Sequence, residues 1–172
     1  WLSALFMGLA ATTKQIAWLF ILFYLILILR EVGWRRTFQS FGVIALTFIA
    51  TNLPFIFSAP QAWMQGVLAP ILDPMFPKGA GPVAFSIAGI LPPNSLLFTL
   101  MEVGVLILSL VWYYFNCRKY PQAGLLLAVL PLFFAWRSFS AYFYFASLLV
   151  FGAAIIEEYG KSAARAKPQL AS

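Results

Sequence analysis

Long apolar runs dominate the sequence and leave few choices for its fold. Several of them approach the roughly 20 residues that a helix needs to cross a bilayer. Only 9% of the 172 residues are charged, whereas a soluble domain carries roughly 25%. The sequence therefore predicts an integral membrane protein of the all-α class, a polytopic bundle of transmembrane helices. The apolar runs are residues 16–29, 38–57, 96–115, 123–136 and 141–156.

A segment rich in proline and glycine interrupts these runs. Eight of the eleven prolines fall between Leu53 and Pro93, so this segment cannot form a single spanning helix. Its two short apolar pieces, Trp63–Leu72 and Val83–Leu91, predict interfacial or re-entrant helices. We therefore divide the chain into a bundle over residues 1–156, with an outer loop at 58–94, and a polar basic tail over 157–172.

The cations cluster in a way that predicts an orientation. The turns 30–36 and 116–121 and the tail after residue 157 contain eight of the eleven Lys and Arg residues. Alternation of the spans puts these three segments on one side, and the positive-inside rule makes that side cytoplasmic. We expect a multi-pass protein of the plasma or inner membrane with a cytoplasmic C-terminus. Clustering of this kind indicates that the cations orient the protein in the membrane and do not bind nucleic acid.

The composition also excludes several kinds of catalytic site. The chain has no histidine, which removes Ser-His-Asp triads and His-ligated zinc. Its single cysteine, Cys117, can form no internal disulfide. No cofactor is indicated with certainty, and a divalent cation enters only as one alternative for Asp73.

Three cations from distant segments, Lys14, Lys78 and Arg137, fall on the predicted outer side. Charges against a bilayer are costly unless they are paired or face a polar cavity. Arginine and lysine gathered at one site suit an anion such as a phosphate. We predict that these three residues bind a donor phosphate, with Lys14 and Arg137 close together. The alternative is that they are interfacial anchors whose side chains snorkel to water.

The same side holds two carboxylates and several aromatic residues. Asp73 either binds a divalent cation, acts on the acceptor, or forms a turn before Pro74. Glu102 is expensive within a span and is expected to pair with one of the three cations. We also expect the outer loop to roof a cavity containing Asp73, Lys78 and Arg137. The aromatic residues expected to contact a sugar or lipid, if they are not a simple aromatic belt, are Trp63, Trp136, Tyr142 and Tyr144.

Short motifs on the outer side point to a family. Residues 8–15, GLAATTKQ, resemble the G-L-A-x-x-T-K-Q stretch of multi-spanning glycosyltransferases with the GT-C fold. Residues 52–55 (NLPF), the pattern Pro60-x-x-Trp63 and residues 136–138 (WRS) with Tyr142 look like the C-terminal half of the same group. That group includes mannosyltransferases that use polyprenyl-phosphate-linked sugars. The resemblance implies hexosyl or mannosyl transfer from a lipid phosphate at the extracytoplasmic face.

The family's catalytic acidic residue lies in its first outer loop, and no position here matches it. The chain also begins at Trp1 inside an apolar run, with no basic region before it. We therefore expect the C-terminal part of a longer enzyme. Its partners would be the bilayer, the lipid-linked donor and the missing N-terminal part of the same chain, with the catalytic residue upstream.

Two other functions remain open at this stage. The chain could be part of a transporter or flippase for an anionic lipid or small solute, with broken helices lining the path. It could also be a structural membrane subunit. An inverted repeat of the hydrophobic segments would favour the transporter, and we find no internal repeat. Nothing in the sequence identifies the donor sugar or the acceptor.

Overall fold

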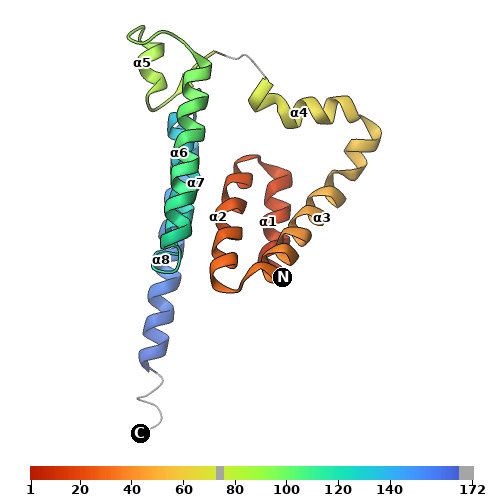
Figure 1. The fold of residues 1–172 in the computed structure, drawn as a ribbon, viewed down its shortest axis with the longest axis vertical. Helices are drawn as coiled ribbons and strands as arrows, with labels where there is room; N and C mark the ends of the chain where they lie inside the picture. Colours follow the sequence, from red (N-terminus) through yellow and green to blue (C-terminus); the bar gives the residue numbers. More distant parts are fainter. Residues whose placement is uncertain (73–75, 167–172) are drawn as a thin grey trace.

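The computed structural model describes residues 1–72 and 76–166, and it is mostly helical (Figure 1). The elements in chain order are α1 (Leu2–Thr13), α2 (Ile16–Glu31), α3 (Trp34–Ser58), α4 (Pro60–Leu72), β1 (Lys78–Gly79), α5 (Val83–Ile87), α6 (Ser95–Asn116), α7 (Ala123–Phe134), β2 (Arg137–Ser138) and α8 (Ser140–Ala166).

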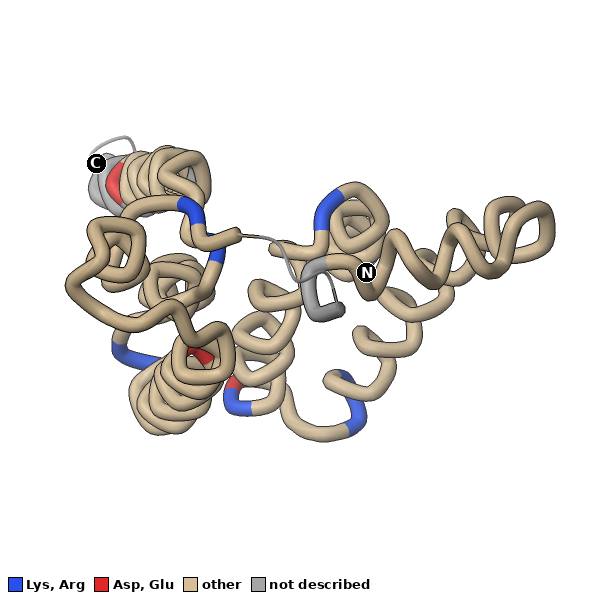
Figure 2. The backbone as a smooth tube through the Cα atoms, turned by 90° about the horizontal axis from the view of Figure 1, so that it is seen from above, with Lys and Arg blue, Asp and Glu red and all other residues tan. Residues whose placement is uncertain are grey.

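Within the described part of the chain, two helices are long and apolar enough to cross a membrane, judged by length and composition. These are α3 and α6, and α1, α7 and the apolar part of α8 are shorter. Viewed from above, the helices carry few charged residues (Figure 2). The two long helices favour membrane association, which is the coarser part of the prediction made from composition.

Two of the basic segments meet at one end of the helices. The Arg118 Nε atom donates a hydrogen bond to the Arg30 carbonyl at 2.9 Å, although 88 positions separate the two residues. The turn before α3 and the turn after α6 therefore lie side by side. Figure 1 shows the α1–α2 turn, α4 and α5 toward the opposite end.

A buried cluster joins α2 to the C-terminal helices. Phe23 packs edge-on against Tyr113 with ring centroids 5.4 Å apart, next to buried Cys117 and Ala128. The Tyr113 hydroxyl donates to the Pro121 carbonyl at 2.8 Å, so its polar end is satisfied. The cluster fixes α2 against α6 and α7.

Close packing of α1 on α3 depends on Gly8. A Cβ atom at this position would lie 2.6 Å from the Thr47 Cβ and 3.0 Å from the Ile44 carbonyl oxygen. Small residues allow such close approach of helices in membranes.

We expect Gly8→Ala to lower the free energy of unfolding by about 1–3 kcal/mol, because the added methyl group overpacks the contact between α1 and α3. Thermal or chemical unfolding in detergent measures the effect. Gly42→Ala is the matched control, since a Cβ there has nothing within 4 Å. Equal effects of the two variants would contradict the close contact.

The α3 helix continues through Pro54 to Ser58, so it ends one residue past the apolar run 38–57 that was predicted as a span. Proline removes one backbone donor, and a helix among apolar neighbours tolerates this when nearby polar side chains bond to its carbonyls. The side chains of Thr51 and Asn52 add hydrogen bonds to the carbonyls of Thr47 and Phe48, in the turns before Pro54. The chain turns instead at Ala59, which precedes Pro60 and has an extended φ of −151°.

The fold also departs from the predicted all-α class in one detail. The strands β1 and β2 form a two-residue parallel pair, with Lys78 opposite Arg137 and Gly79 opposite Ser138. The Ala80 amide donates to the Ser138 carbonyl at 2.9 Å. The outer loop contains two short helices, α4 and α5, and this strand pair fastens its second half to the α7–α8 connection.

Candidate functional site

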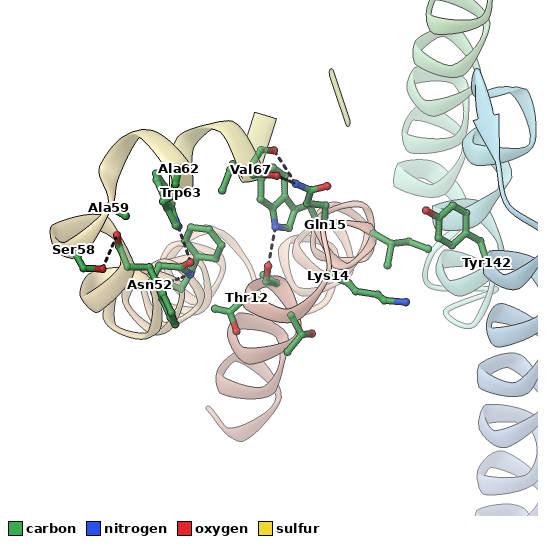
Figure 3. A pocket seen from close by; sticks show the side chains of 17 residues that line it. Thr12, Lys14, Gln15, Asn52, Ser58, Ala59, Ala62, Trp63, Val67 and Tyr142 are labelled. Carbon is green, nitrogen blue, oxygen red and sulfur yellow. Dashed lines mark hydrogen bonds between the residues drawn. The ribbon is translucent and has the colours of Figure 1, made fainter. Parts of the chain in front are cut away.

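A cavity of about 560 Å³ lies beneath α4 (Figure 3). Its walls come from the α1–α2 turn, the last three turns of α3 and residues 62–67 of α4. Tyr142 of α8 completes the lining from the other half of the molecule. The cavity therefore combines segments that are far apart in sequence.

Two side chains hold α4 over this cavity. The Trp63 Nε1 atom donates to the Asn52 Oδ1 atom at 2.8 Å, which ties α4 to α3. The Gln15 Nε2 atom donates to the carbonyls of Gly66 at 3.2 Å and Val67 at 2.8 Å, which ties α4 to the α1–α2 turn. Figure 3 shows both connections as dashed lines. The roof is therefore fixed from two sides.

Lys14 is the cation of this cavity. It is exposed in the α1–α2 turn, and its side chain extends toward the side where Tyr142 lies (Figure 3). The neighbouring Thr12 and Thr13 hydroxyls donate to the carbonyls of Leu9 and Ala10, so their oxygens can still accept. One ammonium group, several hydroxyl groups and aromatic side chains together suit a polar, ring-containing ligand.

The strand pair brings together the other two predicted cations. The Lys78 Nζ atom lies 5.8 Å and the Arg137 Cζ atom 5.1 Å from the centroid of the Phe139 ring. Neither cation has a carboxylate partner among the described residues. The Arg137 Nε atom is buried without a hydrogen-bond partner there, and so is the hydroxyl of fully buried Ser138.

Two glycines make this pairing possible. Gly79 has φ +128°, and a Cβ atom there would lie 1.7 Å from the Ser138 carbonyl oxygen. Gly81 has φ +104°, and its Cβ would lie 2.3 Å from the Phe133 carbonyl oxygen. Residues with a side chain fit neither position. Sequence reasoning missed this role, for which the Gly-Ala-Gly-Pro sequence was the available signal.

The two sites are connected through one aromatic contact. The Phe139 ring, which lies near both Lys78 and Arg137, packs edge-on against Tyr142 with ring centroids 5.7 Å apart. Tyr142 in turn lines the cavity that contains Lys14. The cation pair and the cavity are therefore neighbours, separated by two aromatic rings.

An apolar groove begins beside the strand pair. A hollow of about 520 Å³ runs between α7 and α8. Phe133 and Phe143 lie in its lining with ring centroids 5.8 Å apart, and Phe133 is also the residue that Gly81 approaches. The lining residues are Leu126, Leu127, Val129, Leu130, Phe133, Phe143, Ala146 and Ser147.

The arrangement differs from the predicted single cavity over Asp73, Lys78 and Arg137. Lys78 and Arg137 do not line the cavity beneath α4, which contains Lys14 instead. The continuation of α3 past Pro54 carries α4 over the α1–α2 turn, whereas the strand pair draws residues 78–79 to the α7–α8 connection. The three cations therefore occupy two adjoining sites.

The remaining predicted residues have mixed positions. Trp63 and Tyr142 line the cavity, Trp136 packs against Phe98 with centroids 5.5 Å apart, and Tyr144 is exposed. Asp73 lies outside the described residues. The expected ion pair of Glu102 is not found: Glu102 is half-buried on α6 and pairs with none of the described cations. The strand pair directs two of those cations to Phe139 instead.

Neither a metal site nor a similar known protein indicates a function for the two sites. Among residues 1–72 and 76–166, no group of three or more Cys, Asp or Glu side chains could hold a metal ion. No protein-family model, curated protein or solved structure matches the chain. The geometry of the two sites is therefore what indicates a function.

Proposed function

We propose that this chain binds a phosphate-bearing lipid at the end of the helices opposite the basic turns. In this proposal it is the C-terminal transmembrane part of a GT-C-like glycosyltransferase, a multi-pass membrane protein whose lipid-phosphate-linked sugar donor binds at the extracytoplasmic face. The observation that carries the proposal is the pairing of Lys78 with Arg137 on the Phe139 ring.

The electrostatics of this pair favour an anionic ligand. Two like charges on one ring repel each other, and neither has a carboxylate partner among the described residues. A phosphate between them offsets both charges and accepts several charge-assisted hydrogen bonds. Arginine supplies a planar donor pair that suits phosphate oxygens, and lysine adds a point charge.

The surroundings supply places for the other parts of such a ligand. The apolar groove between α7 and α8 suits a hydrocarbon chain that leaves the phosphate sideways. The cavity beneath α4, reached across Phe139 and Tyr142, offers indole, phenol and hydroxyl groups for a sugar or an acceptor. A phosphate at the cation pair would thus lie between an apolar and a polar compartment.

Binding of a long-chain alkyl phosphate to the protein in nanodiscs tests the proposal. We expect saturable binding that the corresponding alkyl alcohol does not match, because the alcohol lacks the phosphate charge. Equal binding of both compounds would contradict the proposal. A transport assay in proteoliposomes tests the alternative function. Movement of the alkyl phosphate across the membrane, with no sugar transfer detected, would favour the flippase.

The proposed orientation makes a separate prediction. Cysteine introduced at Ser58 should react with a membrane-impermeant thiol reagent from outside, and cysteine at Lys119 only after permeabilisation. Native Cys117 is fully buried and is the internal negative control. Labelling of both introduced cysteines from the same side would overturn the orientation.

A further inference from the structure

The opposite end of the molecule contains a second arrangement of cations, which the proposed function does not use. The Nε and Nη2 atoms of Arg118, in the α6–α7 turn, donate hydrogen bonds to the Arg30 carbonyl at the end of α2. This double contact holds the Arg118 guanidinium next to the Arg30 backbone. It also fixes the two turns to each other.

The Arg30 side chain occupies a partly enclosed position beside this contact. Its Cζ atom lies 4.7 Å from the centroid of the Tyr114 ring. Its Nε atom is buried and has no hydrogen-bond partner among the described residues. A buried guanidinium donor without an acceptor is costly, by about 1–3 kcal/mol or more. The outer nitrogens of the Arg30 guanidinium are not enclosed in this way and donate to no described residue, so they are the atoms that an anionic oxygen of a ligand would reach.

Nearby carboxylates do not fill this role in the described part of the chain. Glu31 follows Arg30 directly but is exposed and forms no ion pair with Arg30 or Arg118. Lys119 adds a third cation and lies over the Tyr120 ring, 5.1 Å from its centroid. The junction of the two turns is therefore positively charged and contains two aromatic rings.

The adjoining surface is apolar. Phe115 at the end of α6 is 70% exposed and Val32 after α2 is 66% exposed. A headgroup held at Arg30 would place its acyl chains along such a surface, whereas a soluble anion would leave it uncovered. Basic pockets between transmembrane helices on the cytoplasmic side suit acidic lipid headgroups.

We propose that the junction of Arg30, Arg118 and Tyr114 binds the phosphodiester headgroup of an acidic membrane phospholipid. The phosphate oxygens accept hydrogen bonds from the Arg30 guanidinium, and the positive charge of Arg118 adds to the attraction. Bound lipid strengthens the connection between the α2–α3 and α6–α7 turns. This site is independent of the sugar-donor site and stands whether or not that proposal holds.

Native mass spectrometry and thermal unfolding in nanodiscs test this site, with phosphatidylglycerol as the acidic probe and phosphatidylcholine as the neutral one. We expect the wild-type protein to retain phosphatidylglycerol selectively and to melt at a higher temperature in its presence. In Arg30→Gln the preference for phosphatidylglycerol should fall by about tenfold or more, since one charge-assisted contact is lost. This substitution leaves the Arg30 carbonyl in place for Arg118.

Arg35→Gln is the matched control, because Arg35 is exposed in the same basic region and also loses one charge. We expect it to keep the preference within about twofold, as isolated surface charges contribute little. If both variants lose the preference for phosphatidylglycerol equally, the preference comes from general surface charge, and the proposed site is overturned. Equal retention of the two lipids by the wild-type protein would overturn it without any variant.

Discussion

Replacement of Gly79 by alanine is expected to lower the affinity for a long-chain alkyl phosphate by at least tenfold. The added Cβ would lie 1.7 Å from the Ser138 carbonyl oxygen, and φ at this residue is +128°. The strand pair therefore has to separate, which removes Lys78 from its place opposite Arg137. Loss of one charge-assisted contact accounts for roughly 1.5–3 kcal/mol. Titration of the lipid in nanodiscs measures the change.

Gly104→Ala is the control for this substitution. Gly104 lies within α6, has no positive φ, and a Cβ there has nothing within 4 Å. Alanine is a better helix former than glycine, so folding should be unchanged or slightly improved. Unchanged lipid affinity in Gly79→Ala, together with intact folding, would mean that the strand pair has no part in binding.

The second large effect is expected at Arg137. Arg137→Ala should weaken phosphate binding by roughly 1.5–3 kcal/mol, which is about tenfold or more. Arg137→Lys should weaken binding less, because it keeps the positive charge and loses only the bidentate hydrogen bonds of the guanidinium group. Lipid titration measures the affinity of the three proteins for the alkyl phosphate. We expect it to be highest in the wild type, lower in Arg137→Lys and lowest in Arg137→Ala. Folding should be largely intact, since the residue is half-buried beside solvent-facing Lys78.

Arg35→Ala is a control of equal charge at the other end of the helices, because Arg35 is exposed and lies outside the proposed phospholipid junction. It should leave the affinity for the alkyl phosphate unchanged. Wild-type binding by Arg137→Ala would show that Arg137 is an interfacial anchor, which was the alternative from the sequence. Equal losses in Arg35→Ala and Arg137→Ala would indicate a general electrostatic effect.

Most of the helices follow from the sequence because a long apolar run is a local signal. The α2 helix begins at Ile16 as predicted, and α6 differs from its predicted run by one residue at each end. The α3 helix ends at Ser58, one residue past its predicted run, although proline usually breaks a helix. The side chains of Thr51 and Asn52 hydrogen-bond to carbonyls of the turns before Pro54.

The sequence predicted one site for the outer cations, whereas the structure distributes them over two adjoining sites. The sequence pointed to Lys14, Lys78 and Arg137 as outer cations, and the pairing of two of them depends on a contact between segments almost 60 positions apart. Such a contact is not visible in local patterns. The contact requires the Gly79 backbone to lie against the Ser138 carbonyl. This requirement becomes visible only from the backbone geometry of the folded chain. Their role in phosphate binding stays a prediction.

Photo-crosslinking tests the central claim most directly. The probe is a long-chain alkyl phosphate with a diazirine near its headgroup, and mass spectrometry locates the adducts. Binding at the cation pair predicts adducts around Phe133, Phe139 and Phe143, which are strongly reduced in Gly79→Ala and by excess unlabelled alkyl phosphate. Adducts spread over the apolar faces of α1 and α3, unchanged by that substitution, would contradict the claim.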